Sequence, residues 1–151
     1  MPWFKLLIGL IQRVTSAQVN VKGAVVAEIS QGLVLFLGIQ KNDNETSAEQ
    51  MLKRVLGLRV FSDDSSRMNL SLQDVSGNLL IISQFTLAAD TQKGLRPSFS
   101  GAAPPDHAKL IYEYFVERAH FSYKDIAAGI FGANMQVSLC NDGPVTFVLE
   151  N

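Results

Sequence analysis

The chain has 151 residues, of which 47% are hydrophobic and 18% are charged, as in a single globular domain with its own core. A net charge of −1 gives no overall attraction to nucleic acid, so any such site must be a local patch. The apolar stretches are too short to span a membrane, and the N-terminus lacks the basic start of a signal peptide. Cys140 stands alone in an apolar run, which predicts a buried, inert thiol in a reducing cytoplasmic compartment.

The first third of the chain is rich in strand patterns. Lys22-Gly23 predicts a hairpin turn between two of the strands. Apolar residues then recur at helical spacing over 48–56, and Ser47 with Gln50 can form a capping box at the start of that helix. The β-prone runs that predict strands are 6–14, 17–21, 24–29 and 33–39.

The middle of the chain predicts two more strands, at 58–61 and 79–87, and then a second helix. A loop over 88–103 leads to Pro104-Pro105-Asp106, which is typical of a helix start because proline suits the first turn and Asp the positive helix end. A Gly-rich connection follows this helix. The stripe that we expect the helix to bury is Ala108, Ile111, Tyr114, Phe115 and the stem of Arg118.

Two apolar runs, 135–140 and 145–149, flank Asn141-Asp142-Gly143-Pro144 near the end of the chain. Such a pattern predicts strand, tight turn, strand. An X-Pro bond can be trans or cis, and a cis Gly143-Pro144 bond would make a rigid pair of carbonyl acceptors. An ordinary hairpin turn is the alternative. The elements together predict one mixed α/β domain with mostly strands and two main helices.

The polar end of the 79–87 strand, Ser83 to Thr86, has two interpretations. Its polar groups either meet water or open on a cleft, where N–H groups and short side chains could hold an oxyanion. A hydroxyl nucleophile here would need an adjacent base, and both histidines, His107 and His120, are expected at the surface. No metal-ligand spacing is present, so neither a metal nor a cofactor is expected.

The sequence leaves two possible roles open for each of three basic residues. Arg13 ends an apolar strand and either extends into solvent or donates to backbone carbonyls through its rigid fork. Lys93 and Arg96 lie in the 88–103 loop and serve either as phosphate contacts or for solubility.

The segments Ser83-Gln84-Phe85-Thr86-Leu87 and Asn141-Asp142-Gly143-Pro144-Val145-Thr146 together resemble the two signature motifs of the D-aminoacyl-tRNA deacylases. The resemblance extends from about residue 8 to the C-terminus. The family begins close to Leu7, so residues 1–6 look like an N-terminal addition and 7–151 like the deacylase domain. Further similar segments are 11–15, 61–63, 68–70, 96–99 and 135–137.

The resemblance implies a three-layer β/β/α fold and a cytoplasmic homodimer that needs no cofactor. The implied activity is hydrolysis of D-aminoacyl-tRNA, and of glycyl-tRNA mischarged on tRNA(Ala), at the 3′-terminal adenosine, with help from the RNA 2′-hydroxyl. A cis Gly143-Pro144 pair from one subunit would enter the pocket of the other and reject L-amino acids, which is chiral proofreading. Neither membrane nor DNA is an implied partner. The implied catalytic residues are Ser83, Gln84, Phe85 and Thr86, and the implied substrate-binding residues are Gly143, Pro144, Arg13 and Phe131.

Two other functions stay open on the sequence. A related deacylase with a trans Gly-Pro bond would accept small L-amino acids. A non-enzymatic β-rich domain would use the C-terminal segment for dimerisation alone, and a deacylation assay separates it from the enzymes.

Overall fold

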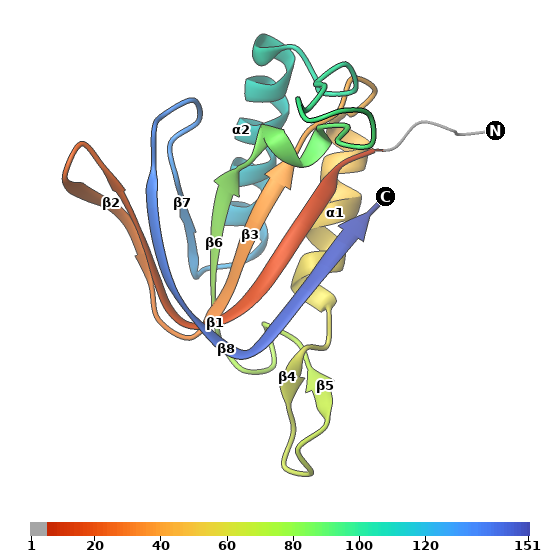
Figure 1. Cartoon of the computed structure of the whole chain (residues 1–151). Helices are drawn as coiled ribbons and strands as arrows, with labels where there is room; N and C mark the ends of the chain where they lie inside the picture. The colour runs from red at the N-terminus through yellow and green to blue at the C-terminus, as the bar shows by residue number, and fades with distance from the viewer. Residues whose placement is uncertain (1–5) are drawn as a thin grey trace.

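The computed structural model describes residues 6–151, so the expected N-terminal addition lies outside the described residues except for Leu6. The main sheet has the order β2-β1-β3-β6-β7, with β8 also paired to β1, and α1 and α2 lie together on one side of it (Figure 1). A small hairpin, β4-β5, extends from one end of the domain (Figure 1). The elements are β1 (Ile8–Val21), β2 (Ala24–Ile29), β3 (Gly32–Gly38), α1 (Glu45–Gly57), β4 (Phe61–Ser62), β5 (Met68–Leu70), β6 (Asn78–Ser83), the 3-10 turn η1 (Phe85–Ala88), α2 (Pro105–Ser122), β7 (Ile126–Ala128) and β8 (Gln136–Glu150).

Two hydrophobic cores separate three layers, because successive side chains of a strand point to opposite faces. Along β6, Leu79 and Ile81 belong to the core against the helices, whereas Leu80 and Ile82 belong to a second core between two parts of the bent sheet. This arrangement is the expected β/β/α layering. The other buried members of the second core are Val14, Ala17, Val19, Ala27, Ile29 and Val34.

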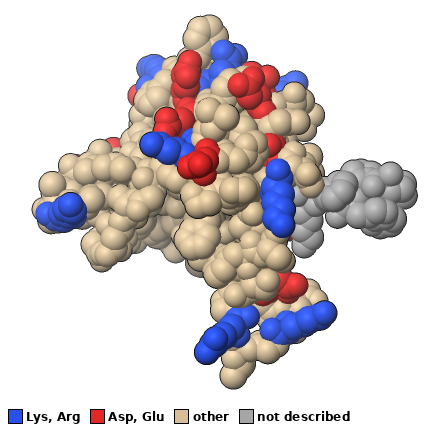
Figure 2. Space-filling model, turned by 90° about the horizontal axis from the view of Figure 1, so that it is seen from above, with Lys and Arg blue, Asp and Glu red and all other residues tan. Residues whose placement is uncertain are grey.

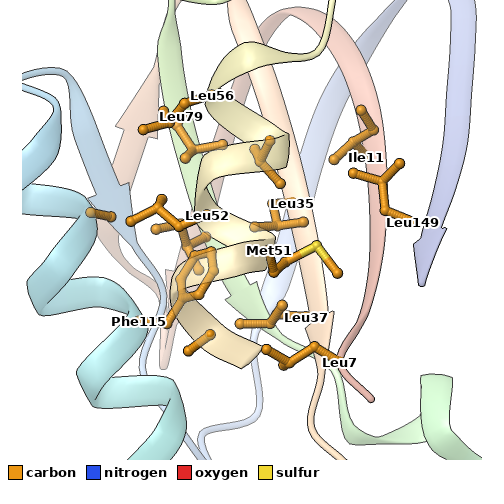
Figure 3. Packing of buried hydrophobic residues seen from close by; sticks show 14 of the residues in the cluster. Leu7, Ile11, Leu35, Leu37, Met51, Leu52, Leu56, Leu79, Phe115 and Leu149 are labelled. Carbon is orange, nitrogen blue, oxygen red and sulfur yellow. The ribbon is translucent and has the colours of Figure 1, made fainter. Parts of the chain in front are cut away.

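The larger core lies between the sheet and the two helices. Figure 3 shows Met51 of α1 and Phe115 of α2 close to Leu35 and Leu37 of β3, and all four side chains are buried. Continuous apolar sequence in β3 is therefore needed, since this strand is covered on both faces. The expected hairpin at Lys22-Gly23 is confirmed, and it joins β1 to β2.

The C-terminal segment is one long strand, so the predicted strand–turn–strand hairpin was wrong. β8 stays antiparallel to β1 along its whole length. Gln12 pairs with Thr146 and Val14 with Asn141, so residues 142–145 bulge opposite Arg13 alone. Gly143 has φ 125° and the Gly143–Pro144 peptide bond is cis. Turns and bulges need the same permissive residues, which is why local sequence did not distinguish them.

Four strand predictions also need correction. The runs 6–14 and 17–21 are parts of the single strand β1, which bends between the two β layers. The strand expected at 58–61 is confined to β4 and begins only at Phe61. The strand expected at 79–87 ends at Ser83, where the chain turns into η1. The short strand β7 was not predicted.

The ends and faces of the helices differ from the prediction in detail. The capping box of α1 is formed by Asn44 and Ser47, which exchange hydrogen bonds of 2.9 Å, rather than by Ser47 and Gln50. In α2, Tyr112 takes the buried place expected for Tyr114, whose hydroxyl donates to Glu49 instead. The predicted start of α2 is confirmed, with Pro104 as the N-cap.

Cys140 is exposed, so the expectation of a buried thiol was wrong. On this half of β8 the odd-numbered residues Val137 and Leu139 are half-buried, and the alternating side chains, including Cys140, point to the other face. An apolar run on a strand at the rim of a domain thus need not be buried on both faces.

Candidate active site

The polar end of β6 opens into a pocket of about 450 Å³. Ser83, Gln84 and Phe85 line it from the junction of β6 and η1, and Phe131 lines it from the connection before β8. The structure therefore brings together four of the residues that sequence singled out. The other lining residues are small or apolar: Ile82, Ala103, Pro105, Ala108, Gly132, Ala133, Met135 and Val137.

A close approach between β3 and η1 places these residues. Gln84 donates its backbone N–H to the Leu37 carbonyl oxygen at 2.8 Å, which carries the chain over the end of β3. A side chain at Gly38 would put its Cβ 2.9 Å from Leu87 Cβ and 3.2 Å from the Gln84 carbonyl oxygen. Glycine at this position thus lets η1 cross β3 and turn the Ser83–Phe85 segment toward the pocket.

Two backbone donors stand at the start of η1. The first hydrogen bond of this turn runs from the Leu87 N–H to the Gln84 carbonyl oxygen, at 3.2 Å. The N–H groups of Phe85 and Thr86 precede that bond, so the turn itself does not use them. Such a pair is a chemically suitable binding site for a carbonyl oxygen that becomes negative.

Thr86 is exposed and does not line the pocket in this chain. Its Oγ1 accepts a hydrogen bond from the Gln84 side-chain amide, with 2.5 Å between the two atoms. An amide is not a base, so this contact orients the hydroxyl without activating it as a nucleophile.

Phe131 packs against Tyr112 of α2, a residue outside the two sequence motifs. The centroids of the two rings are 5.8 Å apart. The Tyr112 hydroxyl donates to the Ile81 carbonyl oxygen at 3.0 Å, and burial raises the pKa of this hydroxyl above its usual value. Tyr112 therefore joins α2 to β6 beneath the pocket. Tyr112 stands four residues after Ala108 and three before Phe115, a helical spacing that could have placed it on the buried face in preference to Tyr114.

Arg13 is the donor to backbone carbonyls that one of its two interpretations required. Its side chain is only 12% exposed. Nε donates to the Asp142 carbonyl oxygen at 3.1 Å, and Nη1 donates to that of Val60 at 2.7 Å. A Cβ on Gly143 would lie 3.2 Å from Arg13 Nη2, so the bulge and the guanidinium pack closely.

The two sequence motifs lie far apart within one chain. Ser83 is level with Gly9 across the sheet, through Leu37, whereas the bulge at 142–145 is level with Arg13, four residues further along β1 (9 to 13). With about 3.4 Å per residue and about 4.8 Å between each of the strands β8, β1, β3 and β6, the separation is roughly 20 Å. Figure 1 agrees, since β6 ends in the upper half of the view, beneath η1, while β8 bends well below it. Gly143 and Pro144, both exposed, therefore do not reach the pocket of their own chain.

His107 and His120 are both outside the pocket lining. His120 is exposed as expected, but His107 is half-buried, and its Nε2 lies 2.7 Å from the Asp43 carbonyl oxygen. The Asp43 carboxylate is itself buried and accepts from the N–H groups of Leu7 and Gln40, at 2.8 and 2.7 Å. This cluster joins β1 to the start of α1 and is structural.

In the view from above no continuous basic area is visible, because Lys and Arg are scattered and, in the upper part of the view, mixed with Asp and Glu (Figure 2). Lys93 and Arg96 are exposed in the loop between η1 and α2. Among residues 6–151, no helix combines the length and hydropathy needed to cross a membrane.

Comparisons with known proteins agree on one family. The family model described as D-Tyr-tRNA(Tyr) deacylase matches residues 10–150. A D-aminoacyl-tRNA deacylase of Cellvibrio japonicus (strain Ueda107) is 57% identical over 144 residues, which cover 95% of this chain and 99% of that protein. One of Salmonella enteritidis PT4 (strain P125109) is 54% identical over 144 residues, with the same coverage of 95% and 99%.

Solved structures match the fold over almost the whole chain. The c-Myc DNA Unwinding Element Binding Protein has a TM-score of 0.91 and 39% identity, covering 95% of this chain and 98% of its own. A probable eukaryotic D-amino acid tRNA deacylase has a TM-score of 0.84 at 14% identity, covering 96% and 99%, which shows a shared fold.

Proposed function

This chain belongs to the D-aminoacyl-tRNA deacylase family, a family of hydrolases, and we propose that it cleaves the ester between a D-amino acid and the 3′-terminal adenosine of tRNA. The family match over residues 10–150, which includes both motifs, carries this proposal. Water would add its oxygen to the acyl carbon, and the ester oxygen would leave with the tRNA as its 3′-hydroxyl. The products are a free D-amino acid and an uncharged tRNA in the cytoplasm.

Catalysis would depend on position rather than on a protein nucleophile. An aminoacyl ester is already activated, so it needs mainly orientation and stabilisation of the oxyanion. The N–H groups of Phe85 and Thr86 would hold that oxygen at the pocket rim. The neighbouring 2′-hydroxyl of the RNA would assist the attack. Such assistance needs no base beside Thr86, whose hydroxyl accepts a hydrogen bond from the Gln84 amide.

Discrimination against L-amino acids would come from the main chain of Gly143 and Pro144. Their carbonyl groups would receive the α-ammonium while the pocket holds the ester, which fixes two of the substituents on the α-carbon. A D side chain then points outward, whereas an L side chain meets the Gly-Pro segment. Glycine has no side chain to reject, so glycyl-tRNA mischarged on tRNA(Ala) would also be a substrate. The alternative is a related deacylase with a trans Gly-Pro bond, which would accept small L-amino acids; the Gly143–Pro144 bond of this chain is cis.

The proposed site needs two subunits. Within one chain the pocket and the Gly143–Pro144 segment are roughly 20 Å apart by strand geometry, and both glycine and proline are exposed. A homodimer in which each subunit lends this segment to the other pocket would complete both sites.

The proposed function is tested by an assay of D-tyrosyl-, D-aspartyl-, glycyl- and L-tyrosyl-tRNA side by side. We expect turnover of the first three and protection of the fourth. Comparable turnover of the L-ester would remove the chirality proposal. Binding of the tRNA without turnover of any ester would instead support a non-enzymatic domain.

A further inference from the structure

The loop that leaves the pocket rim is an ordered arm. Asp90 and Ser98 exchange backbone hydrogen bonds of 2.7 and 2.8 Å, which closes residues 90–98 into a hairpin-like tongue. The Gln92 N–H donates to Asp90 Oδ1 at 2.9 Å, and Gly94 turns the tip with φ 70°. Every residue of the tongue is exposed. Its tip is therefore presented to solvent by a fixed backbone.

Two phenylalanine rings stand where this tongue meets the pocket. Phe85, just before the tongue, lines the pocket, and Phe99 follows the tongue directly. Their ring centroids are 5.3 Å apart with the planes tilted by 45°, yet Phe85 is 57% and Phe99 42% exposed. Large aromatic surface left in water in one place is typical of a contact site rather than of a core.

The charge around these rings favours a polyanion. Lys93 and Arg96 lie on the tongue, and Asp90 is its one acidic residue, so the tongue carries +1 (two cations and one anion) in a chain of net charge −1. Aromatic rings for bases beside cations for phosphates are the two parts of sites that bind single-stranded nucleic acid.

We propose that Phe85 and Phe99 stack on a base of the single-stranded RNA 3′ end, next to the esterified nucleotide, while Lys93 and Arg96 contact the adjoining phosphates. This inference rests on the proposed function, which puts the terminal nucleotide and its ester in the pocket. The strand then leaves over the pocket rim, where Phe85 and Phe99 lie. The penultimate nucleotide is the one that would reach them.

The test uses D-tyrosyl esters of adenosine, of the dinucleotide CA, and of a dinucleotide with an abasic penultimate position. For the wild type, the CA ester should exceed the abasic ester in kcat/KM by about 5- to 140-fold, the range of one stacked base. Phe99→Leu, which keeps an apolar side chain but loses the ring, should lose most of this ratio, and Phe99→Tyr should keep it. Phe121→Leu, at an exposed ring on α2, is the matched control and should keep it.

Equal ratios for the wild type and Phe99→Leu would overturn the inference, since the ring would then not read the base. A change of molecular mass for Phe99→Leu in light scattering, with the ratio intact, would also overturn it and assign the rings to a subunit contact. If no ester is turned over by the wild type, the proposed function fails. In that case, fluorescence anisotropy can still compare the binding of uncharged CCA with that of CCA that is abasic at the penultimate position. If the wild type prefers intact CCA and Phe99→Leu loses this preference, the inference is supported. If the wild type shows no preference, the inference is overturned.

Discussion

Arg13 of β1 holds Asp142 of β8 at two points. Its Nε donates to the Asp142 carbonyl oxygen at 3.1 Å and lies 3.4 Å from the carboxylate Oδ2. The same guanidinium reaches the Val60 carbonyl oxygen at 2.7 Å through Nη1. One planar group thus fixes the Gly143–Pro144 bulge relative to two other segments of the chain.

Arg13→Lys should loosen this bulge, because an ammonium group lacks the rigid fork that bonds both carbonyls at once. We expect a loss of about 1–3 kcal/mol in the free energy of unfolding and a smaller ratio of D- to L-tyrosyl-tRNA turnover. Urea unfolding and the deacylation assay measure the two effects. Arg54→Lys is the matched control, since the Arg54 Nη1 donates to a carbonyl of the same strand, that of Glu150, at an exposed place. A D-to-L ratio that Arg13→Lys leaves unaltered would contradict the role given to Arg13.

Gly143→Ala should damage the site for two reasons that a control can separate. The residue has φ 125°, and its added Cβ would lie 2.9 Å from Val145 Cγ2 and 3.2 Å from Arg13 Nη2. We expect a loss of about 1–3 kcal/mol in unfolding free energy together with a fall in deacylation. Gly23 has a positive φ of 82°, and a Cβ added there would have no atom within 4 Å. Gly23→Ala therefore carries the backbone cost alone. If both variants keep full activity, the bulge does not take part in catalysis.

Local sequence could predict those elements that depend on neighbouring residues. Alternation and Lys22-Gly23 predict the β1–β2 hairpin, and Pro104-Pro105 predicts the start of α2. The bulge at 142–145 could not be predicted, because it depends on the distant strand β1, where Arg13 alone stands opposite. Local patterns therefore predict two short strands in place of the single strand β8.

The sequence indicates the residues that line the candidate site but not the contacts that hold them in place. The resemblance selected Ser83, Gln84, Phe85 and Phe131, which line one pocket although Phe131 comes much later in the chain. Helical spacing from Ala108 and Phe115 could have placed Tyr112 on the buried face of α2, but its contact with Phe131 follows from the way α2 packs on β6. Local spacing indicates which residues are buried, not which distant residues they contact.

Thr86→Ala tests whether the hydroxyl is a nucleophile. We expect deacylation of D-tyrosyl-tRNA to stay within about tenfold of the wild type, because the amide partner of Thr86 is not a base and an essential nucleophile would cost far more. Single-turnover kinetics on saturating enzyme measure the chemical step. Complete loss of that step, with folding and tRNA binding intact, would make Thr86 the nucleophile. Ser83→Ala is the control for loss of a nearby hydroxyl.

The pH dependence of stability should carry a signature of Asp43. Burial raises the pKa of its carboxyl above the usual value, although hydrogen bonds from Gln40, Ser47 and Leu7 oppose the shift. A group with a raised folded-state pKa stabilises fully below its unfolded pKa, about 3.9, and that contribution is lost as the pH rises through the folded pKa. Urea unfolding between pH 4 and 7 measures this fall in the free energy of unfolding.

Asp43→Asn should remove this dependence of the unfolding free energy on pH and still destabilise the domain at neutral pH. One carboxylate oxygen becomes an NH₂ group that faces an N–H donor, which costs about 1–3 kcal/mol. Asp63→Asn is the control, because the Asp63 carboxyl should change the stability with pH in the opposite direction. Hydrogen bonds, first from the Arg67 N–H, lower the Asp63 pKa, so its contribution is lost as the pH falls. Identical pH profiles for the wild type and Asp43→Asn would refute the assignment.

Replacement of Lys93 and Arg96 by alanine together should weaken tRNA binding and reduce its dependence on salt. Each phosphate that a cation neutralises releases condensed counterions, so the slope of log K against log salt should fall by about 0.7–0.9 for each cation that binds a phosphate and is replaced. Filter binding of uncharged tRNA across a range of salt concentrations measures the slope. Lys22 and Lys53, in the β1–β2 turn and on α1, are exposed cations far from the tongue in sequence, and their joint replacement is the control. Because the tongue backbone is closed by the Asp90–Ser98 bonds, the alanine variants should keep its shape, and the change in slope then reports charge alone. A slope that stays at the wild-type value would assign Lys93 and Arg96 to solubility.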